Sequence, residues 1–232
     1  MLLSAGPDKT AATDKSAIMV QPREQSIIMI KILGRIPRSC CVAVSGGVDS
    51  MAVLDFLRRS HDVIVLHYNH GTEFANHAEE VVKKYCQSYD IQLFVGRLGC
   101  EVMPAGVSKE AWWRDKRYNF FDHTFANHLD NRPIITCHHL EDAVENWVFT
   151  SMHGNPALIP YRREKYLRPF LTTRKSEFYS WCERKNVPWV TDPSNTNIAF
   201  RRNYIRHKMI EHALMINPGI HKTIKKKYNK EQ

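Results

Sequence analysis

The sequence predicts an α/β fold: a three-layer parallel sheet with helices on both faces. The first observation is that short apolar runs alternate with longer amphipathic segments between residues 40 and 152. Alternation of this kind gives parallel strands joined by crossover helices. The second is that unusual polar residues follow three of the apolar runs, at 45–50, 68–71 and 138–142. These loops leave the carboxyl edge of the sheet, where α/β proteins bind ligands.

The elements follow in order along the chain. Isoleucines after Ser26 predict a short leading helix that ends near Gly34 and Pro37. Apolar runs then predict four strands, at 40–44, 62–68, 91–95 and 133–137. Apolar residues at helical spacing predict the helices between and after them, at 47–59, 75–89, 108–129 and 140–152.

After residue 154 the character changes. A basic and aromatic segment, 161–171, precedes a predicted helix at 173–186, a loop at 191–195 and a basic helix at 200–214. No separate core is evident here, so we expect residues 155–218 to extend the active edge of the same sheet. The predicted organisation is a disordered leader at 1–24, one domain at 25–218 and a basic tail at 219–232.

The composition is that of a globular protein, with 43% hydrophobic and 25% charged residues. The net charge of +9 is compatible with a polyanionic partner, although charge alone speaks equally to solubility. No apolar run is long enough for a membrane span. None of the six cysteines forms a CxxC pair or has zinc-site spacing. We therefore expect a reducing cytoplasm, that of a bacterium or, for a viral protein, of its host. The oligomeric state is left open.

The hexapeptide that follows the first strand, here called the phosphate loop, is the most informative feature. It consists of Ser45, Gly46, Gly47, Val48, Asp49 and Ser50. Between a strand and a helix, such a turn brings backbone N–H groups and the helix start together around an anion. It lacks the lysine of the GxxxxGK[ST] loop and carries Asp49 instead, which suits Mg²⁺ or the orientation of a nucleotide. The competing interpretation is an ordinary glycine-rich turn.

The second strand ends in His-Tyr-Asn-His-Gly at 67–71. The backbone of Tyr68 is placed to present an amide and a carbonyl to an adenine edge, and His70 to reach phosphate or substrate. Simple capping of a loop by polar residues is the alternative for His70.

The fourth strand leads into a helix with two histidines and two carboxylates, His138, His139, Asp142 and Glu145. Asp142 and Glu145 are three residues apart and share one helix face. Carboxylates there can hold an ammonium group or Mg²⁺. Either one alone is also explained by the preference of acidic residues for a helix start.

Two further segments carry arginines. Arg114, on the long helix, can stabilise charge that develops during nucleotidyl transfer, or it can form an ordinary pair with Glu110 on a solvated face. The later segment suits contacts with phosphates and bases, or is simply a charged amphipathic helix. Its candidate residues are Asn195, Arg202, Asn203 and Arg206.

These segments resemble a known family. The phosphate loop resembles the PP-loop of N-type ATP pyrophosphatases, a Rossmann-like α/β fold. Five other segments resemble motifs of the tRNA(Ile)-lysidine synthetases and occur in the same order. They are 67–71 (HxNHG), 110–118 (EAxxRxxRY), 138–145 (HHxxDxxE), 168–171 (RPLL) and 192–206 (DPSN…RNxIR). The resemblance spans residues 40 to about 218.

The resemblance implies a two-step reaction with ATP and Mg²⁺ as cofactors. ATP adenylates the 2-carbonyl oxygen of the wobble cytidine in an isoleucine tRNA with a CAU anticodon, and pyrophosphate leaves. The ε-amine of free L-lysine then displaces AMP and gives lysidine. Both steps chiefly require positioning and charge stabilisation.

The resemblance also implies roles for single residues. The phosphate loop holds the ATP phosphates, and Asp49 serves Mg²⁺ or ATP. Arg114 stabilises the activated intermediate. Asp142 and Glu145 hold the lysine ammonium and orient the amine. Two side chains meet the lysine carboxylate or the RNA, Arg202 and Arg206.

The chain departs from the family pattern in places. Glu141 and Ala143 stand where many members have Asp and Gln, and Trp112 and Trp113 replace small residues. Members usually continue into a further domain that grips the tRNA, so a reduced form or an altered RNA substrate stays open. The alternatives are a tRNA-thiolating PP-loop enzyme, which usually needs paired cysteines or an iron–sulfur cluster, and a non-catalytic nucleotide- or RNA-binding module.

Overall fold

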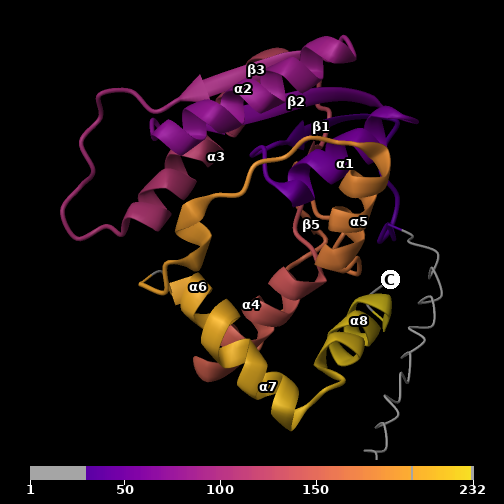
Figure 1. The fold of residues 1–232 in the computed structure, drawn as a ribbon, viewed down its shortest axis with the longest axis vertical. Coiled ribbons are helices and arrows are strands. Elements are labelled where there is room, and N and C mark those ends of the chain that lie inside the picture. The colour runs from indigo at the N-terminus through magenta and orange to yellow at the C-terminus, as the bar shows by residue number, and fades with distance from the viewer. Residues whose placement is uncertain (1–29, 200, 231–232) are drawn as a thin grey trace, which may run out of the picture.

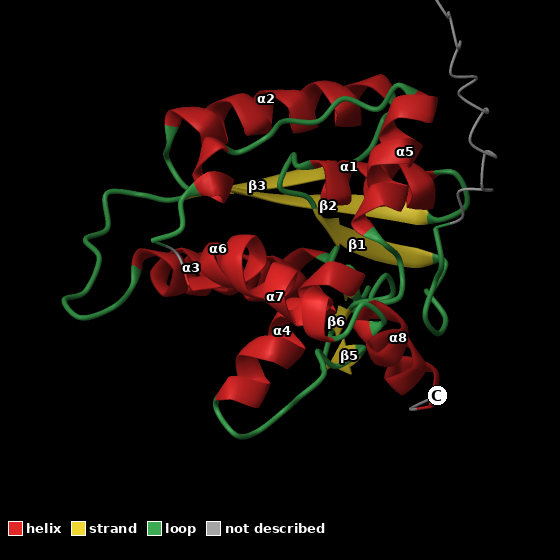
Figure 2. Cartoon of the chain, turned by 60° about the horizontal axis from the view of Figure 1, so that its bottom comes forward, coloured by secondary structure: helices red, strands yellow, loops and turns green. Residues whose placement is uncertain are grey.

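A computed structural model describes residues 30–199 and 201–230. Six strands form one sheet in the order β3-β2-β1-β4-β6-β5, and only the edge strand β5 runs antiparallel to its neighbour (Figures 1 and 2). The strands are β1 (Ser39–Ala43), β2 (Asp62–Asn69), β3 (Leu93–Arg97), β4 (Ile134–Ile135), β5 (Arg162–Arg163) and β6 (Tyr166–Leu167). The predicted α/β fold is confirmed.

Helices cover both faces of the sheet (Figure 2). The helices before the last crossover are α1 (Val48–Arg58), α2 (Glu73–Ser88), α3 (Lys109–His128) and α4 (Leu140–Met152). Those after it are α5 (Lys175–Lys185), α6 (Arg201–Tyr204), α7 (Ile210–Ile216) and α8 (Ile220–Lys230), with a π-helical segment, Ile205–Met209, between α6 and α7. A short 3₁₀ turn, Pro193–Thr196, precedes α6.

Alternating strand residues feed two separate cores. In β1, Cys40 and Val42 pack with α1, α2 and α5, whereas Cys41 packs with Phe121 of α3 on the opposite face. All three strand residues are completely buried. Strands covered on both faces are apolar throughout rather than alternating, which explains the continuous runs in the sequence.

The order of the strands creates the binding crevice. From β1 the chain moves outward to β2 and β3, then crosses to β4 on the other side of β1. The loops that follow β1 and β4 therefore leave the sheet in opposite directions. This is the switch point at which open α/β sheets bind ligands. The phosphate loop follows β1, and His138 and His139 follow β4.

The predicted leading helix is wrong where the structure describes it. Residues 30–38 contain no helix, while 26–29 and the predicted leader at 1–24 lie outside the described residues. The segment has no regular secondary structure, and the N–H of Leu33 donates to the carbonyl of Pro169 at 2.7 Å. The isoleucines at 28, 30 and 32 recur every two residues, which is the period of a strand and not the 3.6-residue period of a helix.

The predicted basic tail is largely a helix of the domain. In α8, Ile224 is fully buried and packs with α4, and His221 is 8% exposed. Their spacing of three residues puts both side chains on one helix face. The run of lysines at 225–227 hides this apolar stripe in the sequence, although only Lys226 is exposed and Lys225 and Lys227 are half-buried. In the described part of the chain, no helix is long and apolar enough to cross a membrane.

Candidate active site

The phosphate loop leads into α1, whose start has no side-chain cap. Gly47 is the N-cap of α1 and offers no side chain to its first N–H groups, which stay available to a ligand. The loop is braced from within by Ser50, whose hydroxyl donates to the Gly47 carbonyl at 2.9 Å and accepts from the Ser45 N–H at 3.1 Å. The two serine hydroxyls also lie 3.2 Å apart. The arrangement suits an oligophosphate.

The two glycines of the loop differ, which gives a matched test. Gly46 has φ +89°, and an added Cβ would lie 3.1 Å from the Cβ of Ala78 on α2. Gly47 has φ −73°, and its added Cβ would be 3.5 Å from the Ser45 hydroxyl. We expect Gly46→Ala to lower the free energy of unfolding by about 1–3 kcal/mol and to weaken ATP binding. Gly47→Ala should leave stability within about 0.5 kcal/mol. Urea unfolding measures both, and equal losses would contradict the assigned role of the positive φ.

Asp49 lies in the crevice among charged groups. Its carboxylate is 3.5 Å from Nζ of Lys175 on α5 and 3.8 Å from Nε2 of His139. Burial raises the pKa of Asp49, although His139 and Lys175 pull in the other direction. Its Oδ1 is buried and has no hydrogen-bond partner among the residues that the structure describes.

The orphaned oxygen of Asp49 fits a cation. Within residues 30–199 and 201–230, no three His, Cys, Asp or Glu side chains are grouped to hold a metal by themselves. A Mg²⁺ ion here would be held by this single carboxylate together with the phosphates of a nucleotide, which is how Mg²⁺ is usually bound at phosphate sites.

The end of β2 lies beside the phosphate loop. His67 contacts the carbonyl of Val44 through Nδ1 at 2.8 Å and so fixes the strand end that enters the loop. The carbonyl of Leu66 accepts from the Val44 N–H. Strand alternation turns the backbone polar groups of Tyr68 toward the same side, past the last residue of β1. The contact of these groups with an adenine edge stays a prediction.

His70 is enclosed by aromatic rings. It stacks on Trp113 of α3 with ring centroids 4.9 Å apart and meets Tyr68 edge-on at 5.0 Å. Burial, and then the nearby Arg117, lower the pKa of His70 to about 4, so the imidazole is neutral. Its Nδ1 is buried without a partner. Trp113, a departure from the family pattern, is therefore a wall of the site.

Asp142 and Glu145 lie side by side on α4, as predicted, and both meet Arg206. The Glu145 carboxylate accepts from Nε and Nη2 of Arg206 at 2.7 and 3.0 Å, and Oδ1 of Asp142 is 3.5 Å from the same Nη2. Oδ2 of Asp142 accepts the N–H of His139 at 2.9 Å as part of a capping box. The carboxylate pair is thus built to hold a nitrogen cation, and the chain itself supplies one.

The two carboxylates are separated in acidity. Burial raises the pKa of Glu145, although Arg206 opposes this. Burial also disfavours ionised Asp142, but His139, His138 and the backbone N–H of His139 outweigh it and lower the pKa of Asp142. The surroundings thus shift the pKa values of the two neighbouring carboxylates in opposite directions.

His139, which is buried, contacts Glu141, which is partly exposed. Nδ1 of His139 is 3.1 Å from Glu141, which also accepts the Lys175 N–H at 2.9 Å and the Arg174 Nε at 2.8 Å. Burial alone would lower the pKa of His139, but Asp142 and Glu141 raise it. Glu141 has a pKa of about 2, because these donors overcome the effect of burial. The extra methylene at Glu141 lets α4 reach the start of α5.

Arg114 on α3 and Arg202 on α6 lie close enough to His138 for their charges to act on it. Arg114 is exposed, lies over the ring of Tyr118 at 4.6 Å and reaches its hydroxyl at 3.4 Å. Nε of Arg202 lies 3.7 Å from Glu110. Burial, followed by the positive fields of these and other arginines, lowers the pKa of His138 to about 4. His138 therefore lies between the carboxylates and the cationic side of the crevice.

The remaining candidates hold the turn before α6. The side-chain amide of Asn203 donates to the carbonyls of Ser194 and Asn197 at 2.9 and 3.0 Å. The carbonyl of Asn195 is 2.8 Å from Nε2 of His207. Both amide hydrogens of Asn203 are thus donated to backbone carbonyls of the protein, and these two bonds hold the turn before α6 in place.

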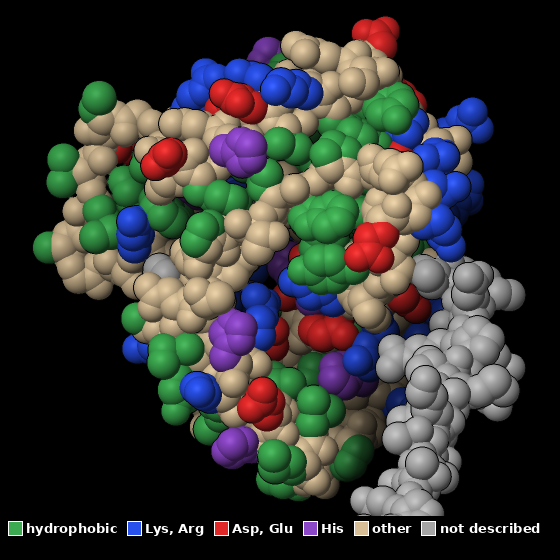
Figure 3. Space-filling view, in the orientation of Figure 1, with side chains coloured by type: hydrophobic (Ala, Val, Ile, Leu, Met, Phe, Trp, Pro, Cys, Tyr) green, Lys and Arg blue, Asp and Glu red, His purple; other side chains and the backbone are tan. Residues whose placement is uncertain are grey.

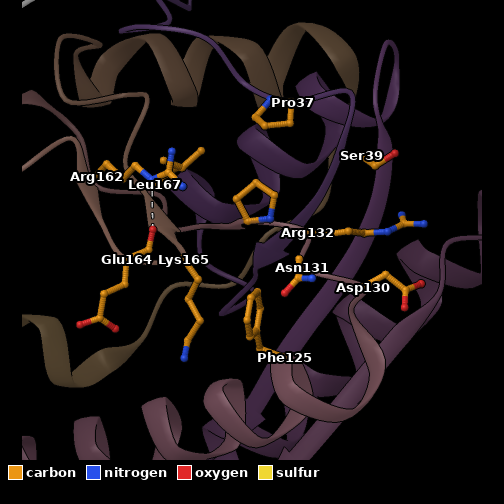
Figure 4. A pocket seen from close by; sticks show the side chains of 11 residues that line it. Pro37, Ser39, Phe125, Asp130, Asn131, Arg132, Arg162, Glu164, Lys165 and Leu167 are labelled. Carbon is orange, nitrogen blue, oxygen red and sulfur yellow. Dashed lines mark hydrogen bonds between the residues drawn. The ribbon is translucent and has the colours of Figure 1, made fainter.

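Sequence reasoning missed Lys175 and the contact between Arg206 and Glu145. Lys175 reaches Asp49, yet its only signal was the basic pair Arg174-Lys175 at a helix start. In Figure 3, acidic, basic and histidine side chains gather in the hollow between α5 and α7. A second hollow, of about 710 Å³, opens at the amino end of β4 and β6 beside Arg132 and Lys165 (Figure 4). None of the candidate residues lines it.

Residues 21–213 match the PP-loop domain family. A tRNA(Ile)-lysidine synthase of Thermotoga maritima is 30% identical over 191 residues, 77% of this chain and 46% of that protein. The tRNA(Ile)-lysidine synthase of Bacillus subtilis is 30% identical over 201 residues, 80% and 42% of the two chains. The chain spans about half the length of these curated relatives.

Among solved structures, the U34-tRNA thiolase NcsA of Methanococcus maripaludis superposes with a TM-score of 0.67 at 14% identity. The match covers 86% of this chain and 75% of the thiolase, and it shows a common fold. The family match includes every strand, the phosphate loop and the paired carboxylates. The chain belongs to the PP-loop domain family.

Proposed function

We propose that the chain catalyses ATP-dependent formation of lysidine at the wobble cytidine of an isoleucine tRNA with a CAU anticodon. The observation that carries the proposal is the pair Asp142 and Glu145, which holds a guanidinium in the same crevice as the phosphate loop. A site built for a nitrogen cation next to a site built for phosphates fits an amine that attacks an adenylated substrate. The named lysidine synthase relatives support the same reaction.

In the first step the cytidine O2 attacks the α-phosphorus of ATP, the O–P bond forms and pyrophosphate leaves. The N–H groups at the start of α1 and the hydroxyl of Ser45 hold the phosphates, while Ser50 braces the loop. Mg²⁺, held by Asp49 and the phosphates, would supply charge neutralisation. Arg114, which has few protein partners, can turn to the charge that develops on the phosphoryl group.

In the second step the ε-amine of lysine attacks C2 of the activated base, and the C–O bond to AMP breaks. An ammonium group must first lose a proton to become a nucleophile. Asp142, with its lowered pKa, stays anionic and holds the amine in place. Glu145, with its raised pKa, is the better proton acceptor. ATP, lysine and tRNA occur together in the cytoplasm, where we place the reaction.

The test is nucleoside mass spectrometry of this tRNA after incubation with ATP, Mg²⁺ and lysine. We expect a lysine adduct on the wobble cytidine, and pyrophosphate release that depends on the tRNA. Omission of lysine is the control and should abolish the adduct only. Absence of the adduct, under conditions where ATP binds, would sink the proposal. It would then favour a non-catalytic nucleotide- or RNA-binding module.

The thiolating alternative makes a different prediction about Cys137. This cysteine lies in the crevice near Asp49, and burial, Asp49 and Asp142 all raise the pKa of its thiol. A protonated thiol is a poor nucleophile. We expect Cys137→Ala to keep adduct formation within about two-fold of the wild type. A loss above about ten-fold with unchanged thermal stability would instead indicate sulfur chemistry. Cys86→Ala, on α2 in the core, is a control for stability alone.

A further inference from the structure

Four cations meet where the carboxyl ends of α1 and α5 pack together, away from the crevice. Arg58 and Arg59 end α1, and Arg184 and Lys185 end α5. The two helices are in direct contact. In Figure 3, Lys and Arg side chains gather at the margin beside α5. Cations at helix ends are favoured by the helix dipole, but this effect does not require two ends to converge.

Aromatic faces lie beneath these cations. The indole of Trp181 has Arg59, Arg184 and Lys185 within 5.4–5.8 Å of its ring centroid. The guanidinium of Arg58 lies 3.4 Å from the centroid of Tyr89, a side chain that is 48% exposed. The α1–α5 patch is defined by these residues, Arg58, Arg59, Tyr89, Trp181, Arg184 and Lys185.

Among the described residues, Asp55 is the one carboxylate that bonds the patch, and the exposed Glu183 beside Arg184 forms no ion pair with it. Asp55 is 1% exposed and accepts hydrogen bonds from Arg58, Arg59 and the Trp181 indole. Among the described residues, Arg184 and Lys185 form no ion pair with a carboxylate. Asp55 therefore holds Arg58, Arg59 and Trp181 in place from the buried side of the patch. The two cations of α5, Arg184 and Lys185, are exposed to solvent. An anionic partner could form ion pairs with these two side chains.

The partner is best matched by nucleic acid. Guanidinium planes and exposed aromatic faces recognise phosphates, riboses and unstacked bases. α1 starts at the phosphate loop and has 11 residues, so its far end lies about 16 Å away along the helix axis. We propose that the α1–α5 patch binds the backbone of the RNA substrate outside the reacting nucleotide. The inference rests on the proposed function only in naming that RNA as tRNA.

The contact would be independent of sequence. Phosphate contacts position an RNA and strengthen binding, but they do not distinguish one base from another. The patch would therefore raise the affinity for tRNAs in general, while the choice of the wobble cytidine is made in the crevice. The predicted effect falls on tRNA affinity and on KM for tRNA, and kcat stays unchanged.

The experiment compares two double variants of equal charge change. Arg184→Gln/Lys185→Gln removes two charges from the patch, and Arg162→Gln/Arg163→Gln removes two from the exposed edge strand β5. We expect the first to weaken tRNA binding about 5- to 10-fold near 0.1 M salt and to reduce the salt slope of the affinity by about 1–2. The exchange Arg184→Lys/Lys185→Arg keeps the charge and should keep the affinity.

Binding is measured without ATP or lysine and with an unrelated tRNA as well, so the result stands even if no lysidine forms. Equal weakening in both double variants would overturn the proposal, because it would reflect net charge alone. Unchanged affinity in the patch variant would overturn it too. Competition by poly-glutamate as strong as that by RNA of equal charge would assign the patch to an acidic protein. The single variants Arg184→Gln and Lys185→Gln, each with a smaller loss, replace the double variant if it fails to fold.

Discussion

Replacement of Asp142 by Asn is expected to reduce lysine transfer by about 100-fold or more and to leave ATP affinity within about two-fold. The oxygen that accepts the His139 N–H is retained in an asparagine, so the capping box and α4 survive. The other oxygen, 3.5 Å from Arg206, becomes an NH₂ group that repels a cation.

Two assays measure this. Lysine adducts are counted by mass spectrometry, and pyrophosphate release is followed with tRNA present. Asp142→Asn should still release pyrophosphate. The control is Asp115→Asn, the same exchange on the exposed surface of α3, which should behave like the wild type. Equal loss of both activities in Asp142→Asn would show that this carboxylate acts in the first step.

Replacement of Arg114 by Gln is expected to slow pyrophosphate release by about 10²–10³-fold, because a donor aimed at developing charge contributes this much to a transition state. Arg114 is exposed and bonds only Tyr118 among the described residues, so the free energy of unfolding should change by less than about 0.5 kcal/mol. Single-turnover rates with saturating ATP and tRNA measure the effect on the first step.

Lys116→Gln is the control for Arg114, since it removes one charge from the same helix at a residue that pairs with Glu101. Its rate should match the wild type. A variant of Arg114 that retains its rate but binds ATP or tRNA poorly would assign this arginine to ground-state binding. Taken together, the two substitutions separate the half-reactions: Arg114→Gln blocks both, and Asp142→Asn blocks only the second.

Local patterns were sufficient for the central layer of the fold. The strands at β1 and β2 lie within two residues of their predicted limits, because uninterrupted apolar runs have few other interpretations. The leading helix failed because residues 30–33 pair with the chain near Pro169, a contact that no local window contains. The β5–β6 hairpin was missed for a similar reason, since each of its strands has only two residues.

In the candidate site too, contacts within one motif could be predicted from the sequence and contacts between motifs could not. Residues within one motif were placed correctly relative to each other, as Asp142 and Glu145 show, because helix geometry fixes a spacing of three. Contacts between motifs were not foreseen. Arg206 meets Glu145 across 61 residues, and Lys175 meets Asp49 across a crossover of the sheet. Such pairs follow from topology, which the residue types alone do not reveal.

The arginine seated on Glu145 has a consequence for selectivity. Arg206 belongs to the π-helical segment, and unwound helical geometry of this kind is frequent at functional sites. Under the proposed function, a lysine ammonium that binds Glu145 would replace the guanidinium of Arg206, so the net charge beside Glu145 would stay the same. The substrate amine and the Arg206 guanidinium would then compete for the same carboxylate. The measured affinity for an amine would therefore be the difference between the binding free energy of that amine at Glu145 and that of Arg206 at the same carboxylate.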